Sequence, residues 1–371
     1  MIVRALLIVL TLALGAVPGP AAPTPAEKKP RVEVVFCLDT TGSMGGLIEG
    51  AKSKIWSICN QIAGGKPSPD LKVGLVAYRD RGDEYVTRVV ELTDDLDAIH
   101  TQLKKFQAGG GGDGPESVNQ AIDDAVNKIK WSTEKRTLRI IFLVGDAPPH
   151  MDYKDDVKYP DTCKKAVEKG ILINTIQCGT DAECARVWRD VAVKSEGSYA
   201  AIPQSGGVVA IRTPYDADLA KLNAELADTT LAYGTMAKRR DADAKVAEAK
   251  ALPAGAAADR AGFGAKAGKG AVKGDLIDDL RERKVDLNRV KDEELPEALR
   301  RLKTPKERDD YVKTVEKKRS DIQKKAAELD KKRGTFIAEE IKKTRGKGGD
   351  SFDSNVLEML RKQAKKFEID Y

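Results

Sequence analysis

Length, composition and charge limit what this chain can be. Its 371 residues allow one large domain or two ordinary ones, but 33% are charged and only 5% are aromatic, so a dense apolar core cannot run through all of it. The formal net charge is only +6, and both signs are interleaved, which argues against a dedicated nucleic-acid-binding protein with a concentrated basic patch.

The N-terminus is predicted to be a secretory signal peptide over residues 1–26. Arg4 supplies a positive start, and the apolar run from Ala5 to Val17 is shorter than the ~20 residues that cross a bilayer. An uncleaved membrane anchor is the alternative, and the cleavage site stays open. We expect the mature protein to be secreted or periplasmic, with no membrane span after the signal is removed.

Residues 31–230 alternate short apolar strands with helical segments. The predicted strands are Val32–Leu38, Lys72–Tyr78, Val86–Leu92, Leu138–Gly145, Ile171–Gln177 and Ser198–Ile202. The helical segments are Gly46–Ala63, Leu96–Phe106, Pro115–Ile129, Asp161–Lys169, Asp181–Ser195 and Asp216–Asp228. This alternation predicts an α/β fold, a doubly wound and mostly parallel six-stranded sheet with helices on both faces. The turn before the third strand is too short for a helix, so that strand should be an antiparallel edge strand.

Five cysteines fit an oxidising compartment. Cys178 and Cys184 lie close together in sequence, after one strand and at the start of a helix, and could close a small disulfide loop. Cys37, inside an apolar strand, is predicted to be a core residue. The chain has no C-x-x-C motif and only two histidines, which argues against a zinc site.

The composition changes after residue 230. Residues 231–274 contain the end of a helix and then an Ala-, Gly- and Lys-rich stretch, which is typical of a flexible linker. Residues 275–371 are predicted to form a charged helical tail, whose main helix should start at the capping box Thr304-Pro305-Lys306-Glu307.

Within this tail, one apolar residue recurs every seven positions, at Val315, Ile322, Leu329 and Phe336. The companion line of a coiled coil would fall on Lys318, Lys325 and Lys332, or on Arg319, Ala326 and Arg333. Both lines are too charged for a strong coiled coil, so we expect a solvated helix that packs one narrow stripe on a neighbour. The tail is also a candidate for self-association or for docking a partner.

The first strand ends abruptly in oxygen-bearing side chains, in the stretch Asp39-Thr-Thr-Gly-Ser43. An aspartate that carries phosphate would explain this pattern, because it resembles the Asp-Lys-Thr-Gly-Thr segment of P-type ATPases, which have the haloacid-dehalogenase fold. Gly145-Asp146 also resembles the last acidic motif of that fold. However, its phosphatases need a second Asp two residues after the first, and this chain has Thr41 there. A haloacid-dehalogenase-like, Mg²⁺-dependent phosphohydrolase with Asp39 as nucleophile is therefore the alternative interpretation.

A bound cation is the other explanation, and three motifs favour it. Asp39-x-Thr41-x-Ser43, Gly111-Gly-Asp-Gly-Pro-Glu116 and Val144-Gly-Asp146-Ala-Pro-Pro-His150 together resemble the von Willebrand factor type A (VWA) domain, over about residues 31–230. The resemblance implies a MIDAS-like metal site at the carboxyl ends of the strands, where doubly wound sheets bind ligands. Oxygen ligands of this kind suit Mg²⁺ or Mn²⁺.

The resemblance also implies which residues hold the ion. Asp39, Thr41, Ser43 and Asp146 match the family pattern, but the family's middle-loop threonine falls on Gly114 here. Asp113, Ser117 or a water would then substitute for it. Glu116 is predicted to be a first-turn acid of the following helix rather than a ligand, and His150 to be structural.

We therefore predict an extracytoplasmic protein-interaction or adhesion module that binds an Asp or Glu carboxylate of a protein partner through the cation. No plausible nucleophile–base pair is present, so we do not expect an enzyme. The remaining alternative is a metal-free scaffolding protein that acts through its helical tail.

Overall fold

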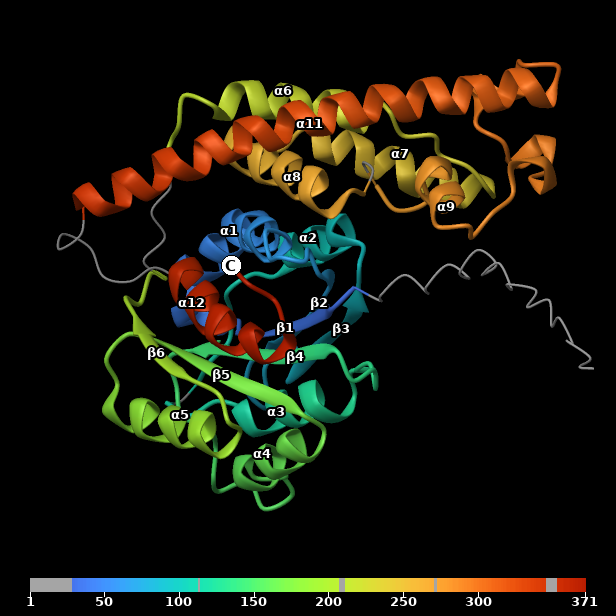
Figure 1. The fold of residues 1–371 in the computed structure, drawn as a ribbon. Coiled ribbons are helices and arrows are strands. Elements are labelled where there is room, and N and C mark those ends of the chain that lie inside the picture. The colour runs from blue at the N-terminus through green and yellow to red at the C-terminus, as the bar shows by residue number, and fades with distance from the viewer. Residues whose placement is uncertain (1–28, 113, 207–210, 270–271, 345–351) are drawn as a thin grey trace, which may run out of the picture.

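The computed structural model describes residues 29–112, 114–206, 211–269, 272–344 and 352–371 (Figure 1). The predicted signal peptide and the candidate ligand Asp113 lie outside these residues. No helix in the described part of the chain is both long and apolar enough to cross a membrane.

One six-stranded sheet organises the first half of the chain, in the order β3-β2-β1-β4-β5-β6. The strands are β1 (Arg31–Asp39), β2 (Asp70–Tyr78), β3 (Thr87–Thr93), β4 (Thr137–Gly145), β5 (Ile171–Cys178) and β6 (Tyr199–Ile202). β3 runs antiparallel to β2, and every other pairing is parallel. The predicted fold class is confirmed, including the reversed edge strand.

Helices cover both faces of the sheet. The helices on one face are α1 (Gly45–Ala63), which follows the 3₁₀ turn η1 (Gly42–Met44), α2 (Leu96–Lys105) and α12 (Phe352–Ala364). The helices on the other face are α3 (Val118–Asn127), α4 (Tyr159–Glu168) and α5 (Ala182–Lys194). Each face has its own apolar core, because alternate side chains of a buried strand point to opposite faces.

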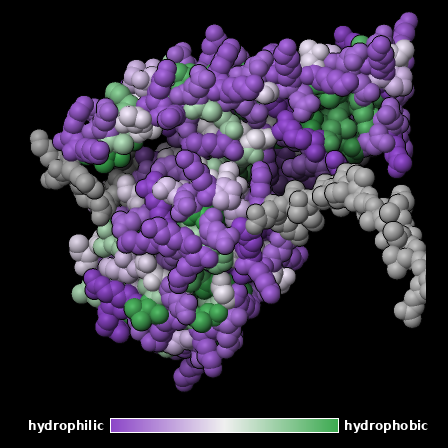
Figure 2. Space-filling model, viewed as in Figure 1, coloured by the Kyte–Doolittle hydropathy of each residue, from purple (hydrophilic) through white to green (hydrophobic). Residues whose placement is uncertain are grey.

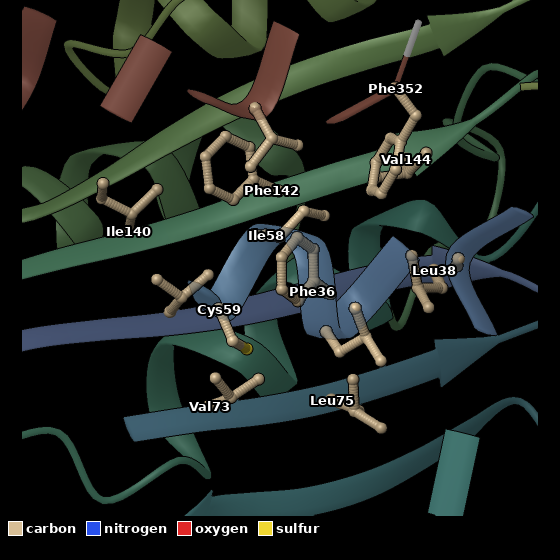
Figure 3. Packing of buried hydrophobic residues seen from close by; sticks show 14 of the residues in the cluster. Phe36, Leu38, Ile58, Cys59, Val73, Leu75, Ile140, Phe142, Val144 and Phe352 are labelled. Carbon is tan, nitrogen blue, oxygen red and sulfur yellow. The ribbon is translucent and has the colours of Figure 1, made fainter. Parts of the chain in front are cut away.

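The first core draws in the C-terminal end of the chain. Phe36 of β1 stacks on Phe142 of β4 with ring centroids 5.6 Å apart, and Phe352 of α12 lies 6.1 Å from Phe36 (Figure 3). The last helix of the predicted tail is thus part of the sheet domain, and Figure 1 shows α12 lying across the strands beside α1. The 3₁₀ turn η4 (Lys365–Phe367) follows it.

The remaining helices form a separate layer above α1 and α2 (Figure 1). They are α6 (Asp216–Ala227), α7 (Met236–Lys250), α8 (Ala254–Ala267), α9 (Leu276–Arg281), α10 (Glu297–Arg300) and α11 (Pro305–Thr344), with the 3₁₀ turns η2 (Leu287–Arg289) and η3 (Asp292–Glu294). Residues 231–274 were predicted to hold a helix end and then a flexible linker, and the linker prediction is wrong where α8 forms. Helix α8 packs against α1, α6 and α11 at once, because the small side chains of its Ala and Gly residues let these helices approach closely. The buried Ala and Gly residues of α8 are Ala257, Ala258, Ala261, Gly262 and Gly264.

Helix α11 begins as predicted. Thr304 Oγ1 accepts from the Glu307 amide at 3.2 Å, and Glu307 Oε2 accepts from the Thr304 amide at 2.9 Å, which completes the capping box. Of the two candidate companion lines, the one at Arg319, Ala326 and Arg333 is buried. It packs inside this chain, so it is not free for self-association.

The predicted disulfide between Cys178 and Cys184 is wrong, and all five cysteines are free and buried. Cys178 belongs to the core on the α1 face, whereas Cys184 belongs to the core on the α5 face. The sheet separates the two thiols because strand β5 ends at Cys178 and the chain then crosses to the other face.

We expect Gly262→Ala to destabilise the protein by about 1–3 kcal/mol, because an added Cβ would overlap Asp330 Oδ1 and lie 2.7 Å from Asn60 Nδ2. Gly255→Ala on the same helix meets nothing within 4 Å and should stabilise by up to ~1 kcal/mol. Urea denaturation of both variants measures the difference. Equal stability of the two would contradict close packing of α8 on α1 and α11.

Candidate metal centre

The carboxyl ends of the two central strands bring the predicted acids together. β1 ends at Asp39 and β4 at Gly145, and these strands pair in parallel, with Leu38 opposite Val144. Asp146 therefore follows β4 beside Asp39. A Cβ at Gly145 would lie 2.9 Å from Asp39 Oδ2, so glycine is needed for the Asp39 carboxylate to fit there.

Asp39 is fully buried, and only one of its two carboxylate oxygens accepts hydrogen bonds from described residues. Its Oδ1 accepts from the Thr41 amide at 2.8 Å and from Thr41 Oγ1 at 2.7 Å. Thr41 Oγ1 lies 3.4 Å from Ser43 Oγ, so both hydroxyls share one corner with the carboxylate. Asp39 Oδ2 is buried and has no hydrogen-bond partner among the residues that the structure describes. A buried, unpaired carboxylate oxygen is costly unless a positive charge meets it.

The pKa of Asp39 reflects this environment. Burial raises it from 3.8 to about 7; the two bonds from Thr41 oppose that rise, and the neighbouring Asp146 adds to it through its charge but opposes it through its backbone amide. Without a cation, Asp39 therefore holds its proton up to near-neutral pH.

Asp146 is held by a residue that sequence reasoning did not single out. Gln204, just after β6, donates from Nε2 to Asp146 Oδ2 at 2.6 Å, and the same nitrogen lies 3.5 Å from the Ser43 carbonyl oxygen. Gln204 thus joins the Asp146 loop to the Thr41–Ser43 loop. The site consequently draws on the ends of three strands, β1, β4 and β6.

Glu116 was expected to be a first-turn helix acid, and this expectation is wrong. Helix α3 begins at Val118, and Glu116 lies in the loop before it, where its amide donates to the Pro148 carbonyl at 2.9 Å and its carbonyl accepts from the His150 amide at 3.1 Å. Its side chain is only 4% exposed, and its Oε2 is buried without a partner within the described ranges. Burial raises the pKa of Glu116 to about 9, and the Asp39 charge adds to this effect.

The sequence could have placed Glu116 in the loop before α3, although not its burial beside Thr41. Glu116 follows Gly114-Pro115, and a proline next to a glycine favours a loop over a helix's first turn. At Gly111 of the same loop, an added Cβ would lie 3.2 Å from Glu116 Oε1 and 3.4 Å from Thr41 Cβ. The Glu116 carboxylate therefore borders the same corner as Thr41.

Two acids of the β2–β3 connection support the middle loop. Asp83 Oδ2 accepts from the Gly111 amide at 3.0 Å and from the Asp80 amide at 3.1 Å. Asp80 accepts from Ser117 Oγ at 2.8 Å and from Tyr153 OH at 2.9 Å. Ser117, one of the three substitutes considered for the family threonine, is thus engaged by Asp80.

His150 is buried, and its contacts hold the loop that follows Asp146 in place. Its ring stacks on Tyr153 with centroids 4.0 Å apart, and its Nδ1 lies 2.8 Å from Asp152 Oδ1. Asn119 Nδ2 donates to the His150 carbonyl at 2.7 Å, which ties the loop to helix α3. These contacts agree with the structural role predicted for His150.

The side chains at this corner offer oxygen ligands of the kind that a hard cation takes. Among the described residues, no group of three or more His, Cys, Asp or Glu side chains lies close enough to hold a metal. What the structure does bring together is two carboxylates, Asp39 and Asp146, and two hydroxyls, Thr41 and Ser43. All four offer oxygen, the ligand type of Mg²⁺ and Mn²⁺, and the unpartnered Asp39 Oδ2 fits an ion at this corner.

Comparisons with known proteins agree with this reading of the fold. A family model of the von Willebrand factor A domain matches residues 33–214. The chain is 30% identical over 142 residues to mouse von Willebrand factor A domain-containing protein 7, covering 32% of this chain and 15% of that protein. It is 29% identical over 121 residues to the Dictyostelium discoideum alpha-protein kinase vwkA, covering 32% and 19%.

Other similarities are also partial. Bovine N-acetyltaurine hydrolase is 31% identical over 94 residues, which is 25% of each chain. Among solved structures, the SpRpn10 VWA domain has a TM-score of 0.37 at 17% identity, over 47% of this chain and 89% of that one. The mussel byssus proximal thread matrix protein 1, with a zinc-occupied MIDAS motif, has a TM-score of 0.34 at 14% identity, over 47% and 42%. The chain matches only a quarter or less of the length of these curated relatives.

Proposed function

Because residues 33–214 form a von Willebrand factor A domain, we propose that this protein is an extracytoplasmic interaction module that binds a partner carboxylate through Mg²⁺ or Mn²⁺. The observation that carries the proposal is the buried Asp39 carboxylate, whose Oδ2 has no partner in the described chain and which shares its corner with the Thr41 and Ser43 hydroxyls. A divalent ion would meet that oxygen.

Each side chain has a role in this proposal. Asp39 and Asp146 supply negative charge, and Thr41 and Ser43 supply neutral oxygens. Asp113 remains a candidate ligand from the sequence. A bound ion supplies Lewis acidity toward an incoming Asp or Glu carboxylate, and the two acids neutralise it without leaving excess negative charge against that carboxylate. Gln204 positions Asp146.

We propose a non-catalytic role. The chain has two histidines, and its five cysteines are all buried, which leaves little material for a nucleophile–base pair. The phosphohydrolase alternative needs a second carboxylate two residues after Asp39. At that position the Thr41 hydroxyl instead donates to Asp39 Oδ1, so the local structure favours ion binding.

Titration with Mn²⁺ is the direct test, by calorimetry and by electron paramagnetic resonance. We expect one ion per chain, and an affinity loss of ~100-fold or more in Asp39→Ala and in Asp146→Ala, since even outer-shell changes cost ~10–100-fold. Asp155→Asn is a matched control, because Asp155 lies in the loop after Asp146 but pairs with Arg81. Adding acetate or a Glu-containing peptide should then change the spectrum of the bound ion.

Partner binding is tested separately, by capture from an extracytoplasmic extract. Under the proposal, EDTA and Asp39→Ala remove the same partners, while the Asp155→Asn protein keeps them. If wild-type protein takes up no Mn²⁺, or if the partners stay bound after both treatments, the cation-bridge proposal is wrong.

A further inference from the structure

Three side chains from three helices meet where the helical layer rests on the sheet domain. Lys266 Nζ on α8 donates to Asn60 Oδ1 on α1 at 2.8 Å and lies 2.7 Å from Asp330 Oδ2 on α11. Asn60 Nδ2 donates to Asp330 Oδ1 at 2.8 Å. Lys266 Nζ also lies 3.4 Å from the Asn60 carbonyl oxygen. The carboxylate therefore contacts both the amine and the amide, and the amine contacts the amide.

The surroundings hold this triad in place. Asn60 and Asp330 are buried, and only the Lys266 side chain is partly open, at 30% exposure. One helical turn before Asn60 and Lys266, Trp56 and Phe263 pack together with ring centroids 6.3 Å apart. The absence of a side chain at Gly262 lets Asp330 and Asn60 approach α8 this closely.

This arrangement brings together the groups that an amide-exchange reaction needs. Lys266 Nζ is an amine nucleophile, and the Asn60 Cγ lies one bond beyond the oxygen it contacts, at most about 4 Å away. Asn60 Nδ2 is the leaving group, and it faces Asp330. Holding the two groups side by side removes the entropic cost of bringing them together, and the attack then needs Nζ to approach Cγ to ~3–3.5 Å.

We propose that Lys266 and Asn60 join in an intramolecular isopeptide bond, with Asp330 as the proton carrier. The Lys266 Nζ–Asn60 Cγ bond forms, and the Asn60 Cγ–Nδ2 bond breaks. Asp330 carries two protons in turn from Nζ to Nδ2, one before the attack and one after it, so that the Asn60 nitrogen leaves as ammonium. The lysine positive charge departs as ammonium, so atoms and charge balance without an oxidant, a cofactor or a second substrate.

The product would link the sheet domain to the helical layer covalently. Asn60 and Lys266 are over two hundred residues apart in the sequence, so the bond would close a long loop in the unfolded chain. Asp330 would keep the new amide anchored to α11. The inference is independent of cation binding, because none of these residues belongs to the metal centre.

Tryptic peptide mapping of the purified full chain by mass spectrometry tests the proposal. Cleavage after Lys54 and Arg260 places Asn60 and Lys266 in different peptides, and trypsin does not cut after an acylated lysine. We expect one branched peptide containing both residues, lighter than its two parts by about 17 Da, the mass of one ammonia. On a denaturing gel, the linked chain should also run faster than an unlinked one.

Two variants distinguish a covalent Lys266–Asn60 bond from non-covalent contact between the same side chains. Lys266→Arg keeps the positive charge near Asp330 but lacks the amine, and Asp330→Asn keeps the shape but removes the proton carrier. Both should give only linear peptides and the slower gel band. The wild-type measurement does not depend on the folding of either variant. If wild-type protein gives only separate, unmodified peptides around Asn60 and Lys266, the proposal is wrong.

Discussion

Asp39→Asn is expected to stabilise the cation-free protein at neutral pH and to abolish its stabilisation by Mg²⁺. The pKa of Asp39 is about 7 in the folded chain against 3.8 for an exposed aspartate. Between these values the unfolded chain releases the proton that the folded chain keeps, so stability falls as pH rises from about 4 to about 7. Above pH 7 the full cost applies, roughly 4 kcal/mol for a raised pKa of this size.

Asparagine avoids this cost without losing the local bonds. Its Oδ1 can still accept from the Thr41 amide and hydroxyl, which contact Asp39 Oδ1 at 2.8 and 2.7 Å. The side chain cannot ionise, so the variant should exceed wild type in EDTA at pH 7.5 and match it at pH 4. In excess Mg²⁺ the order should reverse, because only wild type gains the binding free energy.

Chemical denaturation at both pH values, in EDTA and in Mg²⁺, measures these four stabilities. Asp155→Asn again serves as the control, since it removes a carboxylate outside the centre. If Asp39→Asn is no more stable than wild type in EDTA at pH 7.5, Asp39 is not an uncompensated buried acid. Equal responses of both proteins to Mg²⁺ would contradict its role as a ligand.

The sheet and its acidic edge could be predicted because they depend on local signals. The boundaries of each predicted strand agree with those of an observed strand to within about two residues. Most of these strands are buried and parallel, and such strands give unbroken apolar runs in the sequence. Asp39 and Asp146 follow from the same logic, because residues that end adjacent parallel strands meet at one edge.

The errors arise where long-range packing decides the structure. A stretch rich in Ala and Gly is typical of a flexible linker, but it is also typical of a helix that packs closely between other helices. Residues 254–267 form such a helix because α1 and α11 pack against them, and their own sequence does not reveal these neighbours. The buried position of Glu116 depends on its backbone pairing with the Pro148–His150 segment, which no local pattern reveals. Likewise, nothing in the tail indicates that Phe352 packs on Phe36.

The buried face of α11 could not be chosen from its heptad pattern alone. The sequence offers two candidate companion lines, and both are too charged for a strong coiled coil. The structure selects the line through Arg319, because buried acids lie opposite it. Arg319 is fully buried, donates from Nε and Nη2 to the hydroxyl and carbonyl of Thr229 at 3.0 and 2.8 Å, and pairs through Nη1 with Asp275 and Asp278. A charged residue forms this seam only because its partners come from elsewhere in the same chain.

Arg319→Met is therefore expected to destabilise the protein by about 3–5 kcal/mol, whereas Lys318→Met, the exposed neighbour, should change stability by less than ~0.5 kcal/mol. The large cost comes from Asp275, which is buried and would lose its counter-charge, so a second change should recover part of it. Asp275 also accepts from the Leu231 amide at 2.8 Å, a bond that asparagine can keep. Arg319→Met with Asp275→Asn should then be clearly more stable than Arg319→Met alone when the variants are unfolded in urea. If the second change brings no recovery, the cost lies in lost packing and hydrogen bonds to Thr229 rather than in an unpaired buried charge.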